Sequence, residues 1–450
     1  MENKNIYKRI IIYLEIFILV AIYAVLFYFL WDNLYEQTIQ IPFVKRGNIA
    51  VTLIYPIFIF VFGKLFGMYN AMHARRLDLI LSNVFTLLVV DVLMYFGLVV
   101  LIRHYTDPWP LVTLFIIESL IAVAWVIAIK IVNNKIFPKN KILLIHGEYS
   151  MKDLVLKVNQ RSESYVIAAE INANEGYEKI SSMIDKFDCI MISDLQAEAR
   201  NDIMKYCYEK DKQIYILPKI SDIIIESSDR IHIFDTTAFV YNGYCLTFDQ
   251  LLIKRVMDIV VSSLMIIVTS WVMGLIALAI KLEDNGPVFY KQKRLTRNGV
   301  VFDVIKFRSM RVSAEEDGPQ LSTKNDDRIT KIGRLLRNSH LDELPQLFNV
   351  IKGEMSMVGP RPERPEIAYE YEKVIPEFKY RLKVKAGLTG YAQVYGYYNS
   401  TPYNKLRLDL TYIQNYRVWL DIKCIAKTVV ILFRPEVREG IDDGRKNALK

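Results

Sequence analysis

The sequence predicts a membrane protein of the mixed α and α/β class, divided into three parts. We expect a four-helix transmembrane module over residues 1–138, a parallel-sheet domain over 139–245, and a mostly helical domain over 246–450 that carries one further membrane helix, 259–280. Three observations predict this division. Long apolar runs are concentrated in the first third, short β-rich runs alternate with polar helical segments after them, and the excess of positive charge lies in the last 200 residues.

Composition excludes two other classes of protein. Of the 450 residues, 52% are hydrophobic, which is too many for a disordered chain. The four cysteines are widely spaced, which excludes a small secreted domain held by disulfides. Lys and Arg number 57 against 49 Asp and Glu, a net charge of +8.

Four apolar runs in the first third each approach or exceed the ~20 residues that cross a bilayer. They are Ile10 to Leu30, Ile49 to Phe66, Leu79 to Ile102 and Leu111 to Val132. One such run would fit a buried helix of a large soluble protein, but four in succession do not. The first run has no small-residue cleavage site behind it, so we expect it to remain as a membrane helix.

Basic residues in the short loops predict the orientation of the four spans. Ten fall on one side and three on the other: Lys4, Lys8, Arg9, Lys64, Arg75, Arg76, Lys130, Lys135, Lys139 and Lys141 against Lys45, Arg46 and Arg103. The N-terminus and everything after Val132 are therefore predicted to be cytoplasmic. Asp91 and Glu118 lie inside the spans, where they mark either a substrate pathway or a pairing within the bundle. We favour pairing, because four helices leave little room for a substrate site at the midplane.

The middle part has the βαβα order of a Rossmann-like fold. Strands are expected at Lys141 to His146, Tyr165 to Ile171, Cys189 to Ser193 and Gln213 to Leu217, with helices at Met151 to Gln160, Gly176 to Lys186 and Ala197 to Lys210. A ligand would lie after the first strand, but the G-x-G-x-x-G loop is absent there. One glycine, Gly147, is followed by a carboxylate, Glu148, where a phosphate would approach. We therefore favour a structural or regulatory domain over a working dinucleotide site.

A fifth apolar run, Ile259 to Ile280, is also long enough to span. Cations flank both of its ends, and this favours a re-entrant or interfacial helix over one that crosses. A bend within the bilayer frees backbone groups. Four hydroxyl side chains can bond to carbonyls there while Gly274 relaxes the packing; they are Ser262, Ser263, Thr269 and Ser270.

The positive charge belongs to the last part of the chain. Residues 251–450 hold 33 Lys and Arg against 23 Asp and Glu, net +10, whereas the first 250 hold 24 against 26, net −2. A basic domain beside a membrane helix favours phosphate-rich partners, either anionic membrane lipid or a phosphorylated substrate. Nucleic acid is not expected as a partner, because no recognition fold or stacking motif is visible.

Dense motifs in this part hold the candidate site residues. VIKFRSM places Lys306 and Arg308 on one side of a strand, and RLLRNSHLDELPQLFN contains Arg337 and the adjacent Asp342 and Glu343. VGPRPE presents Arg361 between two prolines, KAGLTGYAQV follows it, and LDLTYIQNYRVWLDIK contains Asp409 and Asp421.

Each of these motifs also has a plainer interpretation. The acidic pair would suit the cap of the following helix, which begins near Pro345. The cations would suit a solvated strand face or loop, and Asp409 and Asp421 would suit the protein surface. An acidic pair, separated cations and a rigid Pro-Arg-Pro loop together are the components that phosphoryl transfer needs.

Residues from about Lys254 to Phe433 resemble the bacterial sugar transferase family, the monotopic-type polyprenyl-phosphate hexose-1-phosphate transferases. KFRSM, LDELPQLFNV, KGEMS, VGPRP, GLTG and AQV carry the resemblance in one order and spacing. The preceding spans and degenerate nucleotide fold look like the long, polytopic branch of that family. The resemblance implies transfer of a hexose 1-phosphate from a UDP-sugar to undecaprenyl phosphate, with release of UMP, as the first step of building a surface polysaccharide repeat. It also implies the cytoplasmic face of the bacterial inner membrane and a homodimer.

The same similarity assigns roles to the candidate residues. Asp342 is the nucleophile that forms a covalent phosphosugar-enzyme in a ping-pong mechanism, and Glu343 helps to hold Mg²⁺. Both agree with physical expectation, because a carboxylate near a helix N-terminus stays ionised and a diphosphate must be neutralised before an anion attacks it. Lys306, Arg308, Arg337 and Arg361 match substrate contacts, and Asp409 and Asp421 match acidic positions near the site.

Two departures from the family pattern stand out. The family commonly has Ser-Pro in the membrane helix, where this chain has Ser270 and Trp271, so the bend is left to Ser270 and Gly274. The family also commonly has proline before GLTG, where this chain has Ala386. The sugar cannot be read from the sequence.

Two other functions remain open at this point. One is a non-catalytic membrane scaffold or regulator. The other is a metal-dependent glycosyltransferase that uses Asp326 and Asp327 and releases UDP.

Overall fold

A computed structural model of the chain describes residues 2–36, 45–70, 74–147, 151–161, 164–243, 246–311, 328–396 and 401–432. It divides into two compact units, Met1–Pro218 and Lys219–Lys450. The first unit contains a helical bundle and a parallel sheet with separate apolar cores, and the second contains the basic, motif-rich part. Glu148, Asp326 and Asp327 lie outside the described residues.

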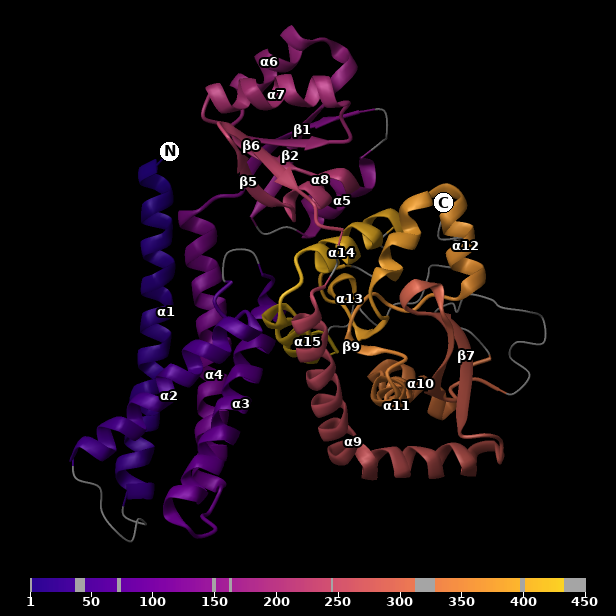
Figure 1. Cartoon of the computed structure of the whole chain (residues 1–450). Helices are drawn as coiled ribbons and strands as arrows, with labels where there is room; N and C mark the ends of the chain where they lie inside the picture. Colours follow the sequence, from indigo (N-terminus) through magenta and orange to yellow (C-terminus); the bar gives the residue numbers. More distant parts are fainter. Residues whose placement is uncertain are drawn as a thin grey trace. The chain divides into compact units, whose positions relative to one another are not determined.

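The four predicted spans are helices, and they pack into one bundle (Figure 1). Their bounds are α1 Glu2–Leu30, continued by η1 Trp31–Tyr35, then α2 Lys45–Phe66, α3 Arg76–Ile102 and α4 Trp109–Ile136. All four are long and apolar enough to cross a membrane. Aromatic side chains fill the centre of the bundle, and apolar side chains such as Phe17 and Val100 point outward. An apolar exterior around a packed interior is what a bundle in lipid requires.

The sheet of the first unit is parallel, with strand order β2-β1-β3-β4. Its strands are β1 Asn140–His146, β2 Tyr165–Asn172, β3 Cys189–Ser193 and β4 Gln213–Ile216, and its helices are α5 Lys152–Arg161, η3 Ala173–Glu175, α6 Tyr177–Asp185 and α7 Ala197–Glu209. The predicted parallel sheet is confirmed, and each predicted strand and helix is present to within a residue or two of its expected ends. Buried Ile and Leu of β1 and β3 form the core of this sheet.

The end of β1 lies directly against the loop after β3. The Gly147 amide donates to the carbonyl of Ser193 at 3.2 Å, and a Cβ on Gly147 would lie 2.2 Å from the carbonyl oxygen of Asp194. Asp194 itself has a left-handed φ of 54°. The glycine therefore allows two backbones to approach each other at the place where a Rossmann fold holds a phosphate.

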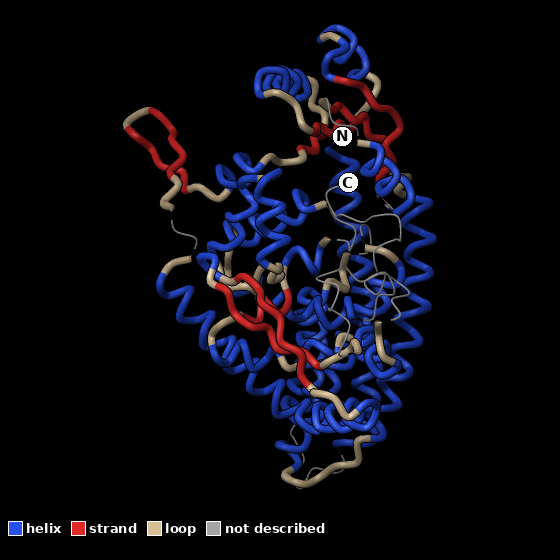
Figure 2. Tube along the Cα trace, turned by 90° about the vertical axis from the view of Figure 1, so that its right-hand side faces the viewer, coloured by secondary structure: helices blue, strands red, loops and turns tan. Residues whose placement is uncertain are grey.

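The second unit contains helices around two short strand pairs and one long ribbon. Its elements are α8 Ile220–Glu226, β5 Asp229–Ile233, β6 Thr236–Val240, α9 Phe248–Asp284, β7 Phe289–Leu295, η4 Arg297–Gly299, β8 Val301–Phe307, α10 Lys331–Ser339, η5 Leu341–Glu343, α11 Gln346–Lys352, β9 Ser356–Val358, α12 Pro365–Val374, η6 Pro376–Lys383, β10 Gly387–Thr389, α13 Tyr391–Tyr395, α14 Pro402–Gln414 and α15 Val418–Leu432. The hairpin β5–β6 extends away from the helices near it (Figure 2). Helix α8 packs in the core of this unit through Ile220 and Ile223, so the compact unit begins earlier than the domain expected to start at residue 246.

Helix α9 contains the fifth apolar run, and it is bent without a proline (Figure 1). Thr269 Oγ1 donates to the carbonyl of Met265 at 2.7 Å, and Ser270 Oγ donates to that of Ile267 at 2.9 Å, as expected for hydroxyl groups that bend a helix. The first half packs on the main core through Met265, and the second half packs on Phe307 and Leu336. Both halves therefore lie against one and the same domain.

Candidate active site

The acidic pair lies in a tight turn between two short helices. Helix α10 ends with His340 in the left-handed region at φ 55°, and this reverses the chain into η5. Helix α11 begins only after Pro345. Asp342 and Glu343 therefore precede the helix instead of capping it, and their side chains are available to other elements.

Glu343 binds two cations through a single oxygen. Its Oε1 accepts from Lys306 Nζ at 2.8 Å and from Arg361 NH2 at 3.0 Å. Lys306 comes from β8 and Arg361 from the loop after β9, so this carboxylate joins three segments. Burial raises the pKa of Glu343, but the two cations outweigh it and hold the pKa well below its usual range. Glu343 is thus a fixed negative charge.

Asp342 has different surroundings although it is the next residue along the chain. It is 9% exposed, and within the described part of the chain no hydrogen bond or ion pair reaches its carboxylate. Burial and the neighbouring Glu343 raise its pKa to about 6, against the pull of Lys306, Arg337 and Arg361. An unpaired carboxylate that is ionised at neutral pH and surrounded by cations is suited to nucleophilic attack on an anionic substrate.

The loop that carries Arg361 is held by its carbonyl oxygens. Prolines 360 and 362 have no N–H, so the loop has few donors of its own. Five carbonyls each accept from elsewhere: Val358 from Lys254 Nζ at 2.9 Å, Pro360 from the Gly387 amide at 2.9 Å, Arg361 from Arg381 NH2 at 3.0 Å, Pro362 from Arg294 NH1 at 2.9 Å, and Glu363 from the Leu295 amide at 3.0 Å. Three of the five donors are cationic side chains, and these give the stronger hydrogen bonds. Arg361 is therefore presented on a rigid backbone.

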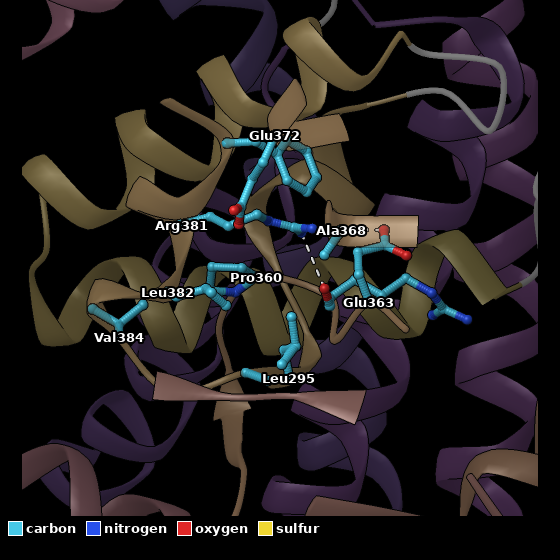
Figure 3. A pocket seen from close by; sticks show the side chains of 11 residues that line it. Leu295, Pro360, Glu363, Ala368, Glu372, Arg381, Leu382 and Val384 are labelled. Carbon is cyan, nitrogen blue, oxygen red and sulfur yellow. Dashed lines mark hydrogen bonds and ion pairs between the residues drawn. The ribbon is translucent and has the colours of Figure 1, made fainter. Parts of the chain in front are cut away.

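Asp409 acts on this loop through Arg381. Arg381 donates to Asp409 Oδ2 through Nε at 2.9 Å and NH2 at 2.8 Å, and both side chains are buried. With only 1% of Asp409 exposed, its carboxylate orients Arg381 and leaves no surface for a substrate. Figure 3 shows Arg381 facing Glu363 across a small hollow behind the loop. At about 10 Å³ the hollow has room for one water molecule and not for a nucleotide.

Asp421 lies in a second buried network at the start of α9. Its carboxylate accepts from Lys254 Nζ at 2.7 Å and from Tyr412 at 2.7 Å, and none of it is exposed. One turn later in α9, Asp258 Oδ1 accepts from the Ser356 hydroxyl at 3.0 Å and the Met357 amide at 2.8 Å. These bonds fix α9 to β9, the strand that leads into the Pro-Arg-Pro loop.

Arg308 is buried and pairs with Asp284, the last residue of α9. A Cβ on Gly286 would overlap its guanidinium, so the glycine allows the side chain to pass beneath the end of the helix. Lys306, two residues earlier, reaches Glu343 instead. Arg308 lies just after β8, so the two cations do not share one side of the strand as predicted, and together they connect the acidic pair with the C-terminal end of α9.

Five of the eight predicted residues lie together, namely Lys306, Arg337, Asp342, Glu343 and Arg361, with Arg337 acting on Asp342 through its charge. Arg308, Asp409 and Asp421 lie in ion pairs around them. Sequence reasoning missed Arg381 of η6 and Arg294 of β7, which hold the loop. It also missed Asn349, which is fully buried and holds β8 through the Ile305 amide and the Asp303 carbonyl. The shortage of donors in a proline loop is a signal that would have predicted such partners.

Two carboxylates in the site, those of Asp342 and Glu343, have oxygen atoms available for a divalent metal ion. Glu343 uses only Oε1 for its cations, and the Asp342 carboxylate has no described partner. In the described residues no three His, Cys, Asp or Glu side chains gather as a metal cage. One or two carboxylates completed by substrate phosphates are a common arrangement for Mg²⁺, so these residues fit that ion.

The comparison with protein families matches residues 249–435 to the family described as bacterial sugar transferase. A UDP-glucose:undecaprenyl-phosphate glucose-1-phosphate transferase of Klebsiella pneumoniae is 43% identical over 185 residues, 40% of this chain and 40% of that protein. A UDP-N-acetylgalactosamine-undecaprenyl-phosphate N-acetylgalactosaminephosphotransferase of Aeromonas hydrophila is 39% identical over 180 residues, 39% of this chain and 43% of that protein.

A third relative is matched over most of its own length. It is a UDP-glucose:undecaprenyl-phosphate glucose-1-phosphate transferase of Caulobacter vibrioides, 40% identical over 183 residues, which are 39% of this chain and 68% of that protein. The matched stretch otherwise spans about two fifths of the length of the relatives named above. The chain belongs to the bacterial sugar transferase family.

Proposed function

We propose that this protein transfers a hexose 1-phosphate from a UDP-sugar to undecaprenyl phosphate, releases UMP, and so starts the synthesis of an exopolysaccharide, capsule or O-antigen repeat unit. The observation that carries the proposal is the unpaired Asp342 carboxylate beside the cation-bound Glu343. The names of the relatives support it, since each is an undecaprenyl-phosphate sugar-phosphate transferase.

The reaction runs in two displacements. A carboxylate oxygen of Asp342 attacks the phosphorus atom that bears the sugar, a new O–P bond forms, and the bond to UMP breaks. A phosphate oxygen of undecaprenyl phosphate then attacks the same phosphorus atom, and the Asp342–phosphorus bond breaks. Asp342 is regenerated as a carboxylate, and the product is undecaprenyl diphosphate carrying the sugar. Because UMP leaves before the acceptor attacks, the kinetics are ping-pong.

Cations around Asp342 stabilise the charge that develops on the transferred phosphoryl group. Arg361 is the most exposed of them at 48%, and its rigid loop holds it for a phosphate oxygen. Lys306 and Arg337 approach from two other elements, β8 and α10. Glu343 would help to hold Mg²⁺, which supplies further positive charge to the diphosphate when bound.

We place the bundle and α9 in the bacterial inner membrane, with the second unit on the cytoplasmic face. The ten-to-three bias of basic loop residues supports this orientation. The bend of α9 and the contact of both its halves with one domain support a re-entrant helix, because a crossing helix would place its two ends on opposite sides. Tags after Lys139 and at Lys450 are expected to be protected in intact cells, and labelling of the C-terminal tag from outside would contradict the re-entrant helix.

The identity of the transferred sugar and the oligomeric state each need their own experiment. The donors in the relatives' names differ, glucose in two and N-acetylgalactosamine in the third, so the sugar is to be found by an assay with a panel of UDP-sugars. We also propose a homodimer, which light scattering of the purified full chain would test.

The nucleotide product separates this function from its alternatives. Membranes that contain the protein, undecaprenyl phosphate, Mg²⁺ and the correct UDP-sugar are expected to release UMP. Release of UDP would identify a conventional glycosyltransferase, and no release with any UDP-sugar would favour a scaffold or regulator. The assay needs Asp342→Ala membranes as the background control.

A further inference from the structure

A buried polar triad joins three helices of the bundle. Tyr55 of α2 lies between Asp91 of α3 and Glu118 of α4, with its hydroxyl oxygen 2.8 Å from Asp91 Oδ1 and 2.7 Å from Glu118 Oε2. Tyr55 and Glu118 are fully buried, and Asp91 is 6% exposed. All three residues lie far from the ends of their helices, which places them near the middle of the bilayer.

The number of available hydrogen atoms determines the charge of this triad. A phenol has one hydrogen and can donate it to only one carboxylate. The second short contact requires a carboxyl group that donates to the phenol oxygen, and only a protonated carboxyl can do so. Two ionised carboxylates cannot both make the contacts that the structure shows.

The described side chains around the triad provide no cation that could pair with its carboxyl groups. Among the side chains that the structure describes, no Lys, Arg or His nitrogen lies within 4 Å of either carboxylate. The other titratable groups that face it are phenols: Tyr23 of α1, which interacts with Glu118, and Tyr69 between α2 and α3, which interacts with Tyr23. Tyr23 is fully buried, and its hydroxyl has no hydrogen-bond partner among the described residues; the same is true of Asp91 Oδ2 and Glu118 Oε1.

We propose that Asp91, Tyr55 and Glu118 form a proton-binding site inside the transmembrane module, in which a proton is held by the two carboxyl groups and can pass between them through the Tyr55 hydroxyl. In one direction Glu118 gives its proton to the phenol oxygen while the phenol gives its own to Asp91, so the charge of the site is unchanged. The site lies outside the transferase machinery. It depends on the proposed membrane placement of the bundle and not on the proposed reaction.

Infrared spectroscopy of the purified full chain in lipid nanodiscs at neutral pH tests this directly. A protonated carboxyl group has a C=O stretching band that a carboxylate lacks. The wild type is expected to show such a band that the Asp91→Asn/Glu118→Gln double variant loses. Asp32→Asn, which removes an exposed carboxyl from the end of the same bundle, is the matched control and should leave the band unchanged. Equal band areas in the wild type and the double variant would overturn the proposal.

A second measurement protects the test against misfolding of the double variant. Tyr55→Phe keeps both carboxyls and removes the bridge, so the band is expected to shift because its hydrogen bond is lost. An unchanged band position in Tyr55→Phe would show that the protonated carboxyl is not hydrogen-bonded to the phenol, and this would overturn the proposed bridge. UMP release by the same samples reports on the transferase reaction alone, so failure of that proposal and failure of this one are distinguishable.

Discussion

Two pairs of carboxyl groups lie in this molecule in opposite surroundings. In the second unit, Glu343 accepts from Lys306 and Arg361, and the neighbouring Asp342 is left ionisable at neutral pH. In the bundle, Asp91 and Glu118 share one phenol and have no described cation beside them. Fixed cations balance the charge of the first pair, whereas one shared proton lowers the charge of the second.

The difference shows that the partner, and not the carboxyl group itself, decides the chemistry. A cation stabilises the charged form of a carboxyl and leaves it able to attack or to bind metal. A phenol in an apolar bundle stabilises a shared proton instead. Replacing the cations of the first pair or the phenol of the second should therefore change the protonation or the reactivity of the carboxyl groups beside them.

The largest effect is expected from Asp342. Asp342→Asn and Asp342→Ala should each lower UMP release by at least about a thousandfold, as the loss of a covalent nucleophile does in other enzymes. Burial next to Glu343 disfavours the charged Asp342, so Asp342→Asn should melt above the wild type at neutral pH, and the gain should shrink as the pH falls through about 6. Near-normal turnover in a folded variant would remove Asp342 as the nucleophile.

The two pairs can be compared with one kind of substitution, glutamate to glutamine. Glu343→Gln removes the charge that Lys306 and Arg361 require, and we expect UMP release to fall about a hundredfold. Glu118→Gln imitates a protonated carboxyl, so activity should stay within about twofold and the free energy of unfolding within about 1 kcal/mol. Similar losses of activity in both variants would contradict the distinction between the pairs.

A smaller effect is expected at Arg381, which holds the loop without contacting substrate. Arg381→Lys keeps a positive charge beside Asp409 but loses the fixed fork of donors, and kcat/KM should fall about tenfold because Arg361 is less well placed. Arg381→Met leaves Asp409 buried without its hydrogen-bonded cation and should cost about 3–5 kcal/mol of stability.

Chemical denaturation and kinetics of the two Arg381 variants distinguish an effect on the placement of Arg361 from an effect on the stability of the folded protein. Loss of activity in Arg381→Lys without loss of stability supports a positioning role. Equal losses of stability in both variants would indicate a purely structural one.

The smallest effect is on the pH profile. Asp342 must be ionised to attack, and its pKa is about 6, so kcat/KM should be level above neutral pH and fall about tenfold per unit well below pH 6. The measurement is UMP release from the correct UDP-sugar in a series of buffers of one ionic strength. A profile that is flat through pH 6 would show that another group limits the reaction.

Much of the fold follows from periodicity and length alone. The four long apolar helices, the parallel sheet and the hydroxyl-to-carbonyl bonds of α9 all agree with the sequence predictions. Dense motifs and a family resemblance predict the acidic pair and its cations as site residues. What the sequence could not provide is which charges pair, because partners such as Arg381 and Asp409 lie 28 residues apart and only the folded chain brings them together. The sequence places Asp409 and Asp421 among the acidic positions near the site, with the protein surface as the plainer alternative, whereas in the structure both are buried counterions.

The bond between Lys254 and Asp421 has a consequence for synthesis of the protein on the ribosome. The two residues are 167 positions apart, at the two ends of the domain. At bacterial rates of translation, Asp421 is added roughly 10 to 30 s after Lys254. Throughout that interval the membrane helix α9 exists without the residue that fixes its base. The earlier partners of this helix, such as Ser356 and Met357 for Asp258, can dock before then, but the counterion of Lys254 is added only when translation is almost complete.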